Sequence, residues 1–241
     1  MNKVSNIQIK PLTNIHKKPR TIEEPLPDPY ADRPFLMVIS SKTGSGKSVL
    51  ISNLLRKIYF RYFDRVYFCS SNINGTDIYD IAYKSIHIPE DRLFDDFNES
   101  IMNNIKEDIM SDEEFEDIQY LLIIDDLPTE LNKRTSKIVK QFLKHRHLHL
   151  SIIITTQKLN LLNLSIRNNA THLISYKTNN KDERKSMTTM TELDEDIFNK
   201  YLDYATNEKY NFLFVDLNDN PTKFYKNFNY ELNVENLMEI N

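Results

Sequence analysis

Short apolar runs alternate with stretches of helical periodicity along most of the chain. We expect strands near residues 35–40, 65–70, 120–125, 151–156 and 172–176, and helices near residues 47–60, 96–110, 134–146 and 194–205. The run at 120–125 is continuously apolar up to its last residue, as is typical of a strand buried on both faces. Strands and helices that alternate in this way predict an α/β fold, with a mostly parallel sheet and helices on both of its faces.

The two ends of the chain differ from this alternating part. Residues 1–34 combine basic side chains with a cluster of prolines, so we expect an extended N-terminal arm there and a folded domain over residues 35–241. From about residue 208, the segments 210–216 and 222–225 predict two strands joined by a turn. We therefore expect the domain to end in a β-hairpin.

A glycine-containing loop joins the first predicted strand to the first predicted helix. The chain has only three glycines, and two of them, Gly44 and Gly46, lie in this loop. The loop fits the Walker A pattern, in which backbone N–H groups surround the phosphates of a nucleotide. Lys47 would bring its charge to the β- and γ-phosphates, and Ser48 would offer a hydroxyl to Mg²⁺. The expected nucleotide-binding residues are Ser41, Lys42, Thr43, Gly44, Ser45, Gly46, Lys47 and Ser48.

The loop departs from the strict Walker A pattern at one position. The pattern has glycine where this chain has Ser41. We expect this small residue to permit the same turn. The plain alternative is a chance Gly-x-Gly sequence in a strand-to-helix turn.

Two adjacent carboxylates, Asp125 and Asp126, end the apolar run that begins at Tyr120. This is the Walker B pattern, in which the first acid holds Mg²⁺, and Asp126 is then placed to deprotonate the attacking water. The next predicted strand ends at Gln157, whose amide can donate and accept hydrogen bonds and is a candidate sensor of the γ-phosphate. Without a phosphate loop, the acids would be interpreted as a turn or helix cap, and Gln157 as a strand cap.

Further short motifs follow in a fixed order. Arg146-His147 precedes the strand that ends in Thr-Thr-Gln, and Ile166-Arg167-Asn168-Asn169 follows it. With the Walker A loop and Ile-Ile-Asp-Asp, this order resembles the viral DNA-packaging ATPases of the FtsK–HerA superfamily. The branch is typified by poxviruses and is shared by other large DNA viruses and virophages. The resemblance covers roughly residues 34–180.

The resemblance implies a P-loop NTPase with a RecA-like (ASCE) core and a ring of subunits. It also implies translocation of double-stranded DNA into a capsid, with ATP and Mg²⁺ as cofactors. Capsid or portal-vertex proteins are implied partners, and the host cytoplasm (the virus factory) or the virion is the implied location. In this family an arginine near Arg167 is a candidate finger that reaches the nucleotide of the adjacent subunit. Arg146 is a rival for that role, and a local ion pair is the plain alternative.

Charge is unevenly distributed in a chain whose formal net charge is −4. Residues 90–117 hold twelve acids and two bases, whereas residues 132–185 hold twelve bases and two acids. On a helix, four lysines of the basic segment would share one face, which is either a contact for DNA phosphates or a solvated surface. They are Lys133, Lys137, Lys140 and Lys144. We expect the opposite face, with Ile138, Val139, Phe142 and Leu143, to join the core, and the acidic segment to meet a neighbouring subunit.

Several classes of protein are disfavoured by composition. A single cysteine, Cys69, excludes an internal disulfide and a multi-cysteine zinc site, and the histidines at 145, 147 and 149 cannot share one helical face. No apolar stretch reaches the length of a membrane helix, so no membrane partner is expected.

The sequence therefore predicts an ATP-hydrolysing, DNA-packaging motor. The alternatives are a helicase or DNA-pumping ATPase that is not tied to a capsid, and a P-loop nucleotide or nucleoside kinase. A kinase usually has an arginine-rich lid, and the chain shows no such run. A GTPase is disfavoured because Asn132-Lys133-Arg134-Thr135 lacks the aspartate that reads guanine. A non-catalytic scaffold is disfavoured by the complete pair of Walker motifs.

Overall fold

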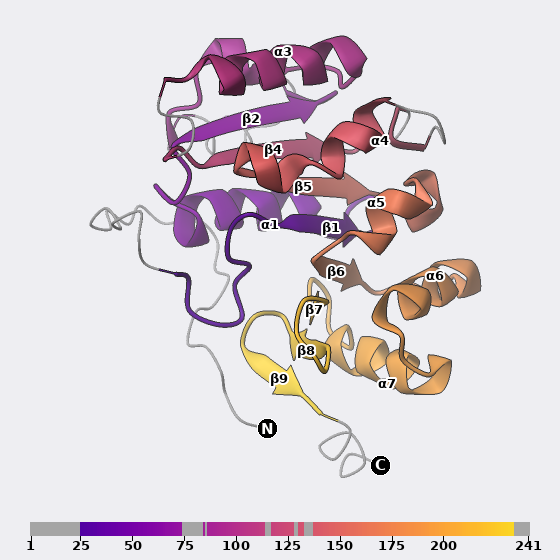
Figure 1. Ribbon diagram of the computed structural model, residues 1–241. Coiled ribbons are helices and arrows are strands. Elements are labelled where there is room, and N and C mark those ends of the chain that lie inside the picture. Colours follow the sequence, from indigo (N-terminus) through magenta and orange to yellow (C-terminus); the bar gives the residue numbers. More distant parts are fainter. Residues whose placement is uncertain are drawn as a thin grey trace.

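The computed structural model describes residues 25–73, 84, 86–113, 117–127, 130–132 and 137–233. Their central feature is a nine-stranded sheet in the order β3-β2-β4-β5-β1-β6-β7-β8-β9 (Figure 1). The strands are β1 (Leu36–Ser40), β2 (Arg65–Ser70), β3 (Leu93–Phe94), β4 (Tyr120–Asp125), β5 (Leu150–Thr156), β6 (His172–Tyr176), β7 (Phe212–Asp216), β8 (Lys223–Lys226) and β9 (Tyr230–Leu232). The five strands expected in the α/β part are all present.

Six neighbouring strands run parallel, as the alternating pattern predicts. In the order of the sheet they are β3, β2, β4, β5, β1 and β6. β5 lies between β1 and β4, so the strand that carries the phosphate loop is separated from the strand that carries the paired acids by one strand. The register pairs Ser40 with Thr156 and Asp125 with Thr155. Because the strands are parallel and in this register, their polar carboxyl ends meet at one edge of the sheet.

Helices cover both faces of this sheet. They are α1 (Lys47–Asn53), α3 (Glu99–Ser111), α4 (Lys137–Phe142), α5 (Leu164–Asn168), α6 (Lys181–Thr191) and α7 (Glu195–Ala205). α1 continues into a π-helical turn, Leu54–Ile58, so the helix expected over 47–60 is confirmed. α3 begins where Asn98 Oδ1 accepts a hydrogen bond of 3.0 Å from the amide of Ile101. None of the described helices is both long and apolar enough to cross a membrane.

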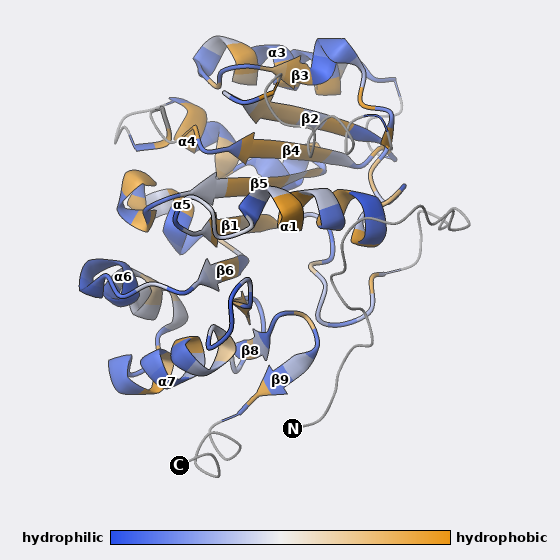
Figure 2. Cartoon of the chain, turned by 180° about the vertical axis from the view of Figure 1, so that it is seen from behind, coloured by the Kyte–Doolittle hydropathy of each residue, from blue (hydrophilic) through white to orange (hydrophobic). Residues whose placement is uncertain are grey.

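The alternation of side chains along β1 divides the core into two clusters. Leu36 and Val38 face the cluster that includes the buried sides of α3 to α7, whereas Met37 and Ile39 face the cluster built with α1. Figure 2 shows apolar strands in the interior and, around them, helices that combine hydrophilic and hydrophobic positions. Helices therefore lie on both faces, as predicted.

The N-terminal boundary of the folded domain differs from the expected one. Leu26, Tyr30 and Ala31 are buried and belong to the cluster on the α1 face. The proline-rich segment from residue 25 onward thus packs on the domain, and the arm we placed at 1–34 extends too far into the chain. Residues 1–24 lie outside the described part of the structure.

The C-terminal β addition is confirmed and is larger than expected. β7 pairs antiparallel with β6, β8 pairs with β7, and a third strand, β9, pairs with β8. These strands extend the sheet on the β6 side (Figure 1). α7 packs on the addition, where the rings of Tyr201 and Phe224 stack with centroids 4.6 Å apart.

The basic helix ends earlier than the segment expected over 134–146, whose residues 134–136 lie outside the described part of the structure. α4 ends at Phe142, and a 3₁₀ turn, His145–Leu148, leads into β5. Ile138, Val139 and Phe142 are buried, as expected, but Leu143 is 45% exposed, because the α-helix has ended before it. The assignment of Leu143 to the core is therefore wrong.

Candidate active site

The backbone of the glycine-containing loop has the curvature that a phosphate-binding loop requires. The loop joins the end of β1 at Ser40 to the start of α1 at Lys47. Gly44 and Gly46 have φ angles of 77° and 100°, in the left-handed region that favours glycine. Ser41 has no positive φ, is buried, and donates its amide hydrogen to the carbonyl oxygen of Thr156 at 3.0 Å. A serine is tolerated at this position because its backbone needs no left-handed conformation.

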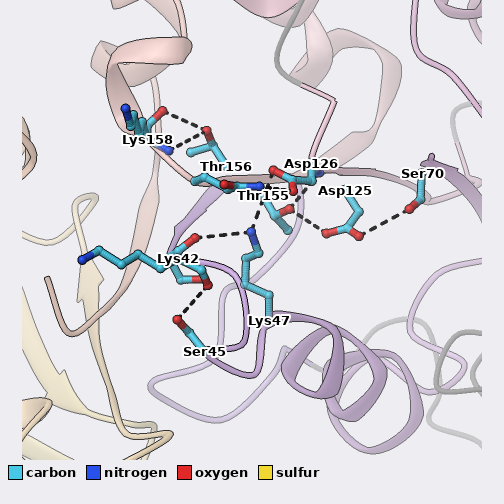
Figure 3. Close-up of polar contacts among 11 residues, drawn as sticks. Lys42, Ser45, Lys47, Ser70, Asp125, Asp126, Thr155, Thr156 and Lys158 are labelled. Atoms are coloured by element: carbon cyan, nitrogen blue, oxygen red, sulfur yellow. Dashed lines mark hydrogen bonds and ion pairs between the residues drawn. The ribbon is translucent and has the colours of Figure 1, made fainter. Parts of the chain in front are cut away.

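The side chain of Lys47 crosses the loop toward the paired acids. Its ammonium donates to the carbonyl oxygen of Ser41 at 3.3 Å and lies 3.9 Å from Asp126 Oδ1. Ser45 Oγ donates to the carbonyl oxygen of Lys42 at 2.7 Å, which closes the turn (Figure 3). The loop is thus shaped by its own hydrogen bonds, and its lysine points to the place where the charges of the site converge.

Asp125 is buried and is held by hydroxyls from the strands on both sides. Thr155 Oγ1 donates to its Oδ1 at 2.6 Å, and Ser70 Oγ donates to its Oδ2 at 3.4 Å (Figure 3). The register places Ser70, Asp125 and Thr155 beside one another on three neighbouring strands. Hydroxyl donors of this kind fix the direction of a carboxylate. Its oxygens and the hydroxyl of Ser48 are the hard donors that Mg²⁺ prefers, so the residues fit the expected metal.

Asp126 follows β4 directly and turns its side chain toward the loop. Its φ is 58°, a conformation that aspartate adopts more readily than most residues. The amide of Asp126 donates to Thr155 Oγ1 at 3.0 Å, and Gln157 Nε2 donates to Asp126 Oδ2 at 2.7 Å. The side chain is 28% exposed and can therefore reach water. The structure brings Lys47, Asp126 and Gln157 together, as the motifs predicted.

Thr155 is the residue that sequence reasoning missed in this cluster. Its hydroxyl accepts from the amide of Asp126 and donates to the carboxylate of Asp125, so one buried side chain positions both acids. The signal in the sequence is a polar residue at the end of an apolar strand. Only the register shows that it lies opposite Asp125.

A cavity of about 320 Å³ adjoins the first half of the loop. Lys42, Lys158 and Lys177 line it, together with Glu183 of α6. Glu183 is buried, and its carboxylate accepts from the amide of Leu159 at 3.0 and 3.1 Å and from Ser40 Oγ at 3.3 Å. Sequence reasoning missed Glu183. The one signal in the sequence is the capping pattern of α6, in which Asn180 is the N-cap and Glu183 lies in the first turn.

The two candidate arginines lie on the two segments that flank β5. Arg146 is exposed on the 3₁₀ turn before β5, at the opposite end of that strand from Gln157. Arg167 lies on α5, which follows the carboxyl end of β5, and its Nε is buried without a hydrogen-bond partner among the described residues. After Arg167 the chain returns to the amino ends of β6 and β1: the amide of Ala170 donates to the carbonyl oxygen of Arg167 at 3.2 Å, and the amide of Thr171 donates to that of Leu36 at 2.8 Å.

The predicted lysine stripe is only partly available for other contacts. Lys137 Nζ lies 2.8 Å from Glu99 Oε1 of α3, while Lys140 and Lys144 are exposed. Gln141 Nε2 also donates to Asn103 Oδ1 at 2.8 Å. α3 of the acidic segment therefore contacts the basic helix of the same chain, whereas we expected that segment to meet a neighbouring subunit. Lys133 lies outside the described residues.

His145 has a structural role at the start of β5. Its Nδ1 lies 2.7 Å from the carbonyl oxygen of Leu150, and burial lowers the pKa of the imidazole. Within the part of the chain that the structure describes, no group of three or more histidine, cysteine or acidic side chains is placed to hold a metal ion.

The fold and the site together define a P-loop ATPase of the RecA-like class. The phosphate loop follows the central strand β1, the paired acids end β4, and β5 between them carries Gln157. The sequence profile of the family described as the poxvirus A32 protein matches residues 28–200, and the chain belongs to this family. The resemblance inferred from the motifs is confirmed.

Solved structures share the fold at low sequence identity. The DNA-packaging ATPase B204 from Sulfolobus turreted icosahedral virus superposes with a TM-score of 0.61 and 17% identity, covering 80% of this chain and 98% of that one. The genome-packaging NTPase B204 from Sulfolobus turreted icosahedral virus 2, in complex with ATP-γ-S, gives a TM-score of 0.60 and 17% identity, covering 81% and 98%.

A third structure extends the comparison beyond viral proteins. The pCW3 conjugation coupling protein TcpA, with ATPγS, gives a TM-score of 0.53 and 12% identity, covering 86% of this chain and 65% of that one. At these identities the likeness concerns the fold. No curated protein sequence matches the chain significantly.

Proposed function

We propose that this protein is an ATP-driven motor that translocates double-stranded viral DNA into a capsid. The observation that carries the proposal is the cluster of Lys47, Asp126 and Gln157 at the phosphate loop of a chain that belongs to the poxvirus A32 family. The structures with the same fold include genome-packaging NTPases that bind ATP analogues, which supports a nucleotide as the ligand of the loop.

ATP would occupy the loop with its γ-phosphate toward the paired acids. Lys47 and the backbone amides of the loop would bind the β- and γ-phosphates, and Ser48 and Asp125 would hold Mg²⁺. The metal neutralises the charge that develops on the phosphoryl oxygens. When Lys47 binds phosphate, its ammonium no longer lies beside Asp126, and that carboxylate becomes available to water.

Asp126 would then act as the general base. A water molecule hydrogen-bonded to Asp126 attacks the γ-phosphorus, its proton passes to the Asp126 carboxylate, and the bond to the ADP oxygen breaks. Gln157 donates to Asp126 Oδ2 and therefore holds the base in place. Gln157 would also respond to the γ-phosphate. When Lys47 turns to the phosphate, Asp126, the partner of Gln157, loses its ion pair with the lysine.

A ring of subunits would couple this chemistry to movement along DNA. Arg167 of α5 is the arginine that would reach the nucleotide of the next subunit, with Arg146 as the alternative. The exposed lysines of the α4 region, Lys140 and Lys144, are the part of the predicted stripe that could contact DNA phosphates. Capsid or portal-vertex proteins would anchor the ring at the point of genome entry.

The test is ATPase activity measured with and without double-stranded DNA. A motor hydrolyses ATP faster when DNA is present, and Asp126→Asn should bind ATP but remain inactive in both conditions. Single-stranded DNA of the same length serves as the control, because a packaging motor should respond to the duplex. The proposal would be contradicted if DNA did not change the rate of ATP hydrolysis and the protein transferred phosphate to a nucleoside. Those results would identify a kinase.

A further inference from the structure

Tyr210 is a large exposed aromatic side chain that lies against the phosphate loop. A Cβ placed on Gly46 would stand 3.3 Å from Tyr210 Cδ1 and 4.0 Å from the hydroxyl of Tyr176. The Tyr210 side chain is nevertheless 58% exposed, although most large apolar rings of the chain are buried. The ring thus covers the backbone of Gly46 on one side and leaves its remaining surface open.

The backbone around Tyr210 holds the ring in this place. Tyr210 has a φ of 70°, which is uncommon for an aromatic residue. The next residue, Asn211, donates its amide to the carbonyl oxygen of Glu208 at 3.3 Å and accepts from Asn227 Nδ2 at 3.1 Å. Lys209 Nζ lies 4.8 Å from the centroid of the Tyr210 ring. The C-terminal β addition therefore presents the ring from a fixed turn.

The order of the strands shows which end of a nucleotide would meet this ring. Asp126 and Gln157 follow β4 and β5, on one side of β1, and they mark the reactive end of the phosphate chain. Tyr176 ends β6 and Tyr210 precedes β7, on the other side of β1. A triphosphate that points its γ-phosphate at Asp126 directs its nucleoside toward Tyr210.

We propose that Tyr210 is the platform on which the nucleobase stacks. Every base has a π-face, and stacking on an aromatic side chain stabilises a bound nucleotide without reading its hydrogen-bonding edge. The ring would thereby fix the nucleoside end while the loop fixes the phosphates. The inference rests on the proposed function only in requiring that the loop binds a nucleotide, and it does not depend on DNA or on a ring of subunits.

The test compares ligands with and without a base. Titration calorimetry with ADP and with inorganic tripolyphosphate, both with Mg²⁺, separates the contribution of the base from that of the phosphates. Tyr210→Ala should weaken ADP binding about 5- to 100-fold, the range that base stacking supplies, and leave tripolyphosphate binding unchanged. Tyr210→Phe keeps the ring and should bind ADP within about twofold of the unaltered protein. Tyr230→Ala, which removes a partly exposed ring from β9, is the matched control.

A second readout uses the fact that the chain contains no tryptophan. Tyr210→Trp introduces a single indole, whose fluorescence should change when ADP binds and stay constant with tripolyphosphate. If Tyr210→Ala and the unaltered protein bind ADP with equal affinity, the base does not stack on Tyr210. The proposed ATPase function would be unaffected by that result. Equal weakening for ADP and tripolyphosphate would overturn the platform too, because the ring would then act on the phosphate loop. If the unaltered protein binds no nucleotide, the platform and the proposed function fail together.

Discussion

Replacement of Thr155 by valine tests whether one buried hydroxyl positions both acids of the site. Valine has nearly the shape of threonine but can neither donate to Asp125 nor accept from the amide of Asp126. A hydrogen bond to a charged group contributes about 1.5–3 kcal/mol, and a buried donor left without an acceptor costs about 1–3 kcal/mol. If the first contribution is expressed in the transition state, kcat should fall about 10- to 100-fold, since 1.4 kcal/mol corresponds to a factor of ten.

The chain offers a close control in the adjacent residue. Thr156 is equally buried, and its hydroxyl donates to the carbonyl oxygen of Lys158 at 2.8 Å, away from the acids. Thr156→Val therefore makes the same chemical change with a similar effect on packing and polarity. Thr155→Ser should retain most activity because it keeps the hydroxyl.

The assay is steady-state ATP hydrolysis at saturating Mg·ATP, together with ADP affinity and thermal unfolding. We expect Thr155→Val to lower kcat with little change in ADP affinity, and Thr156→Val to hydrolyse ATP at close to the unaltered rate. Equal rates for the two valine variants would refute the reasoning, because the hydroxyl of Thr155 would then contribute no more to catalysis than its neighbour.

Four further predictions concern single features. Asp126→Asn should bind ATP with unchanged affinity and hydrolyse it about 10²–10⁴-fold more slowly, so a normal rate would remove Asp126 as the base. Arg167→Ala should bind ATP and hydrolyse it poorly, and rings mixed with Asp126→Asn subunits should recover part of the activity, unless Arg167 acts within its own subunit. Changing Lys140 and Lys144 to alanine should weaken the salt dependence of DNA binding. The slope of log affinity against log salt concentration, measured by filter binding, should fall by about 0.9 for each phosphate that is no longer neutralised. Burial lowers the pKa of His145 below its unfolded value, so stability should fall as pH drops through about 6.5 and the unfolded chain takes up the proton. His145→Asn should flatten that dependence in urea unfolding, and an unchanged slope would show that another group titrates.

The catalytic motifs could be predicted because their positions are set by local sequence. An apolar strand followed by glycines and a lysine, or by two acids, contains the strand, the turn and the reactive groups in one short segment. The conformations of Gly44 and Gly46 follow from such a segment. Five of the six parallel strands were predictable for the same reason, whereas β3 has only two residues and gives no such pattern.

Features that depend on register or on distant segments could not be read from the chain. Thr155 becomes important only because β5 places it opposite Asp125, and Tyr210 only because the C-terminal strands fold back on the loop. α6 escaped prediction because it buries only three residues, Glu183, Met187 and Thr191, and shows little apolar periodicity. Leu143 was misplaced because a helical pattern in sequence continues past the residue where the helix ends.

The buried carboxylate of Glu183 makes three segments of the site mechanically dependent on one another. It accepts hydrogen bonds from Ser40 at the end of β1 and from the amide of Leu159 beyond β5, while its own backbone belongs to α6. Displacing either segment alone would break a hydrogen bond to a buried charge, at a cost of about 1.5–3 kcal/mol. We therefore expect the base of the phosphate loop, the turn that follows Gln157 and the first turn of α6 to move together and not independently.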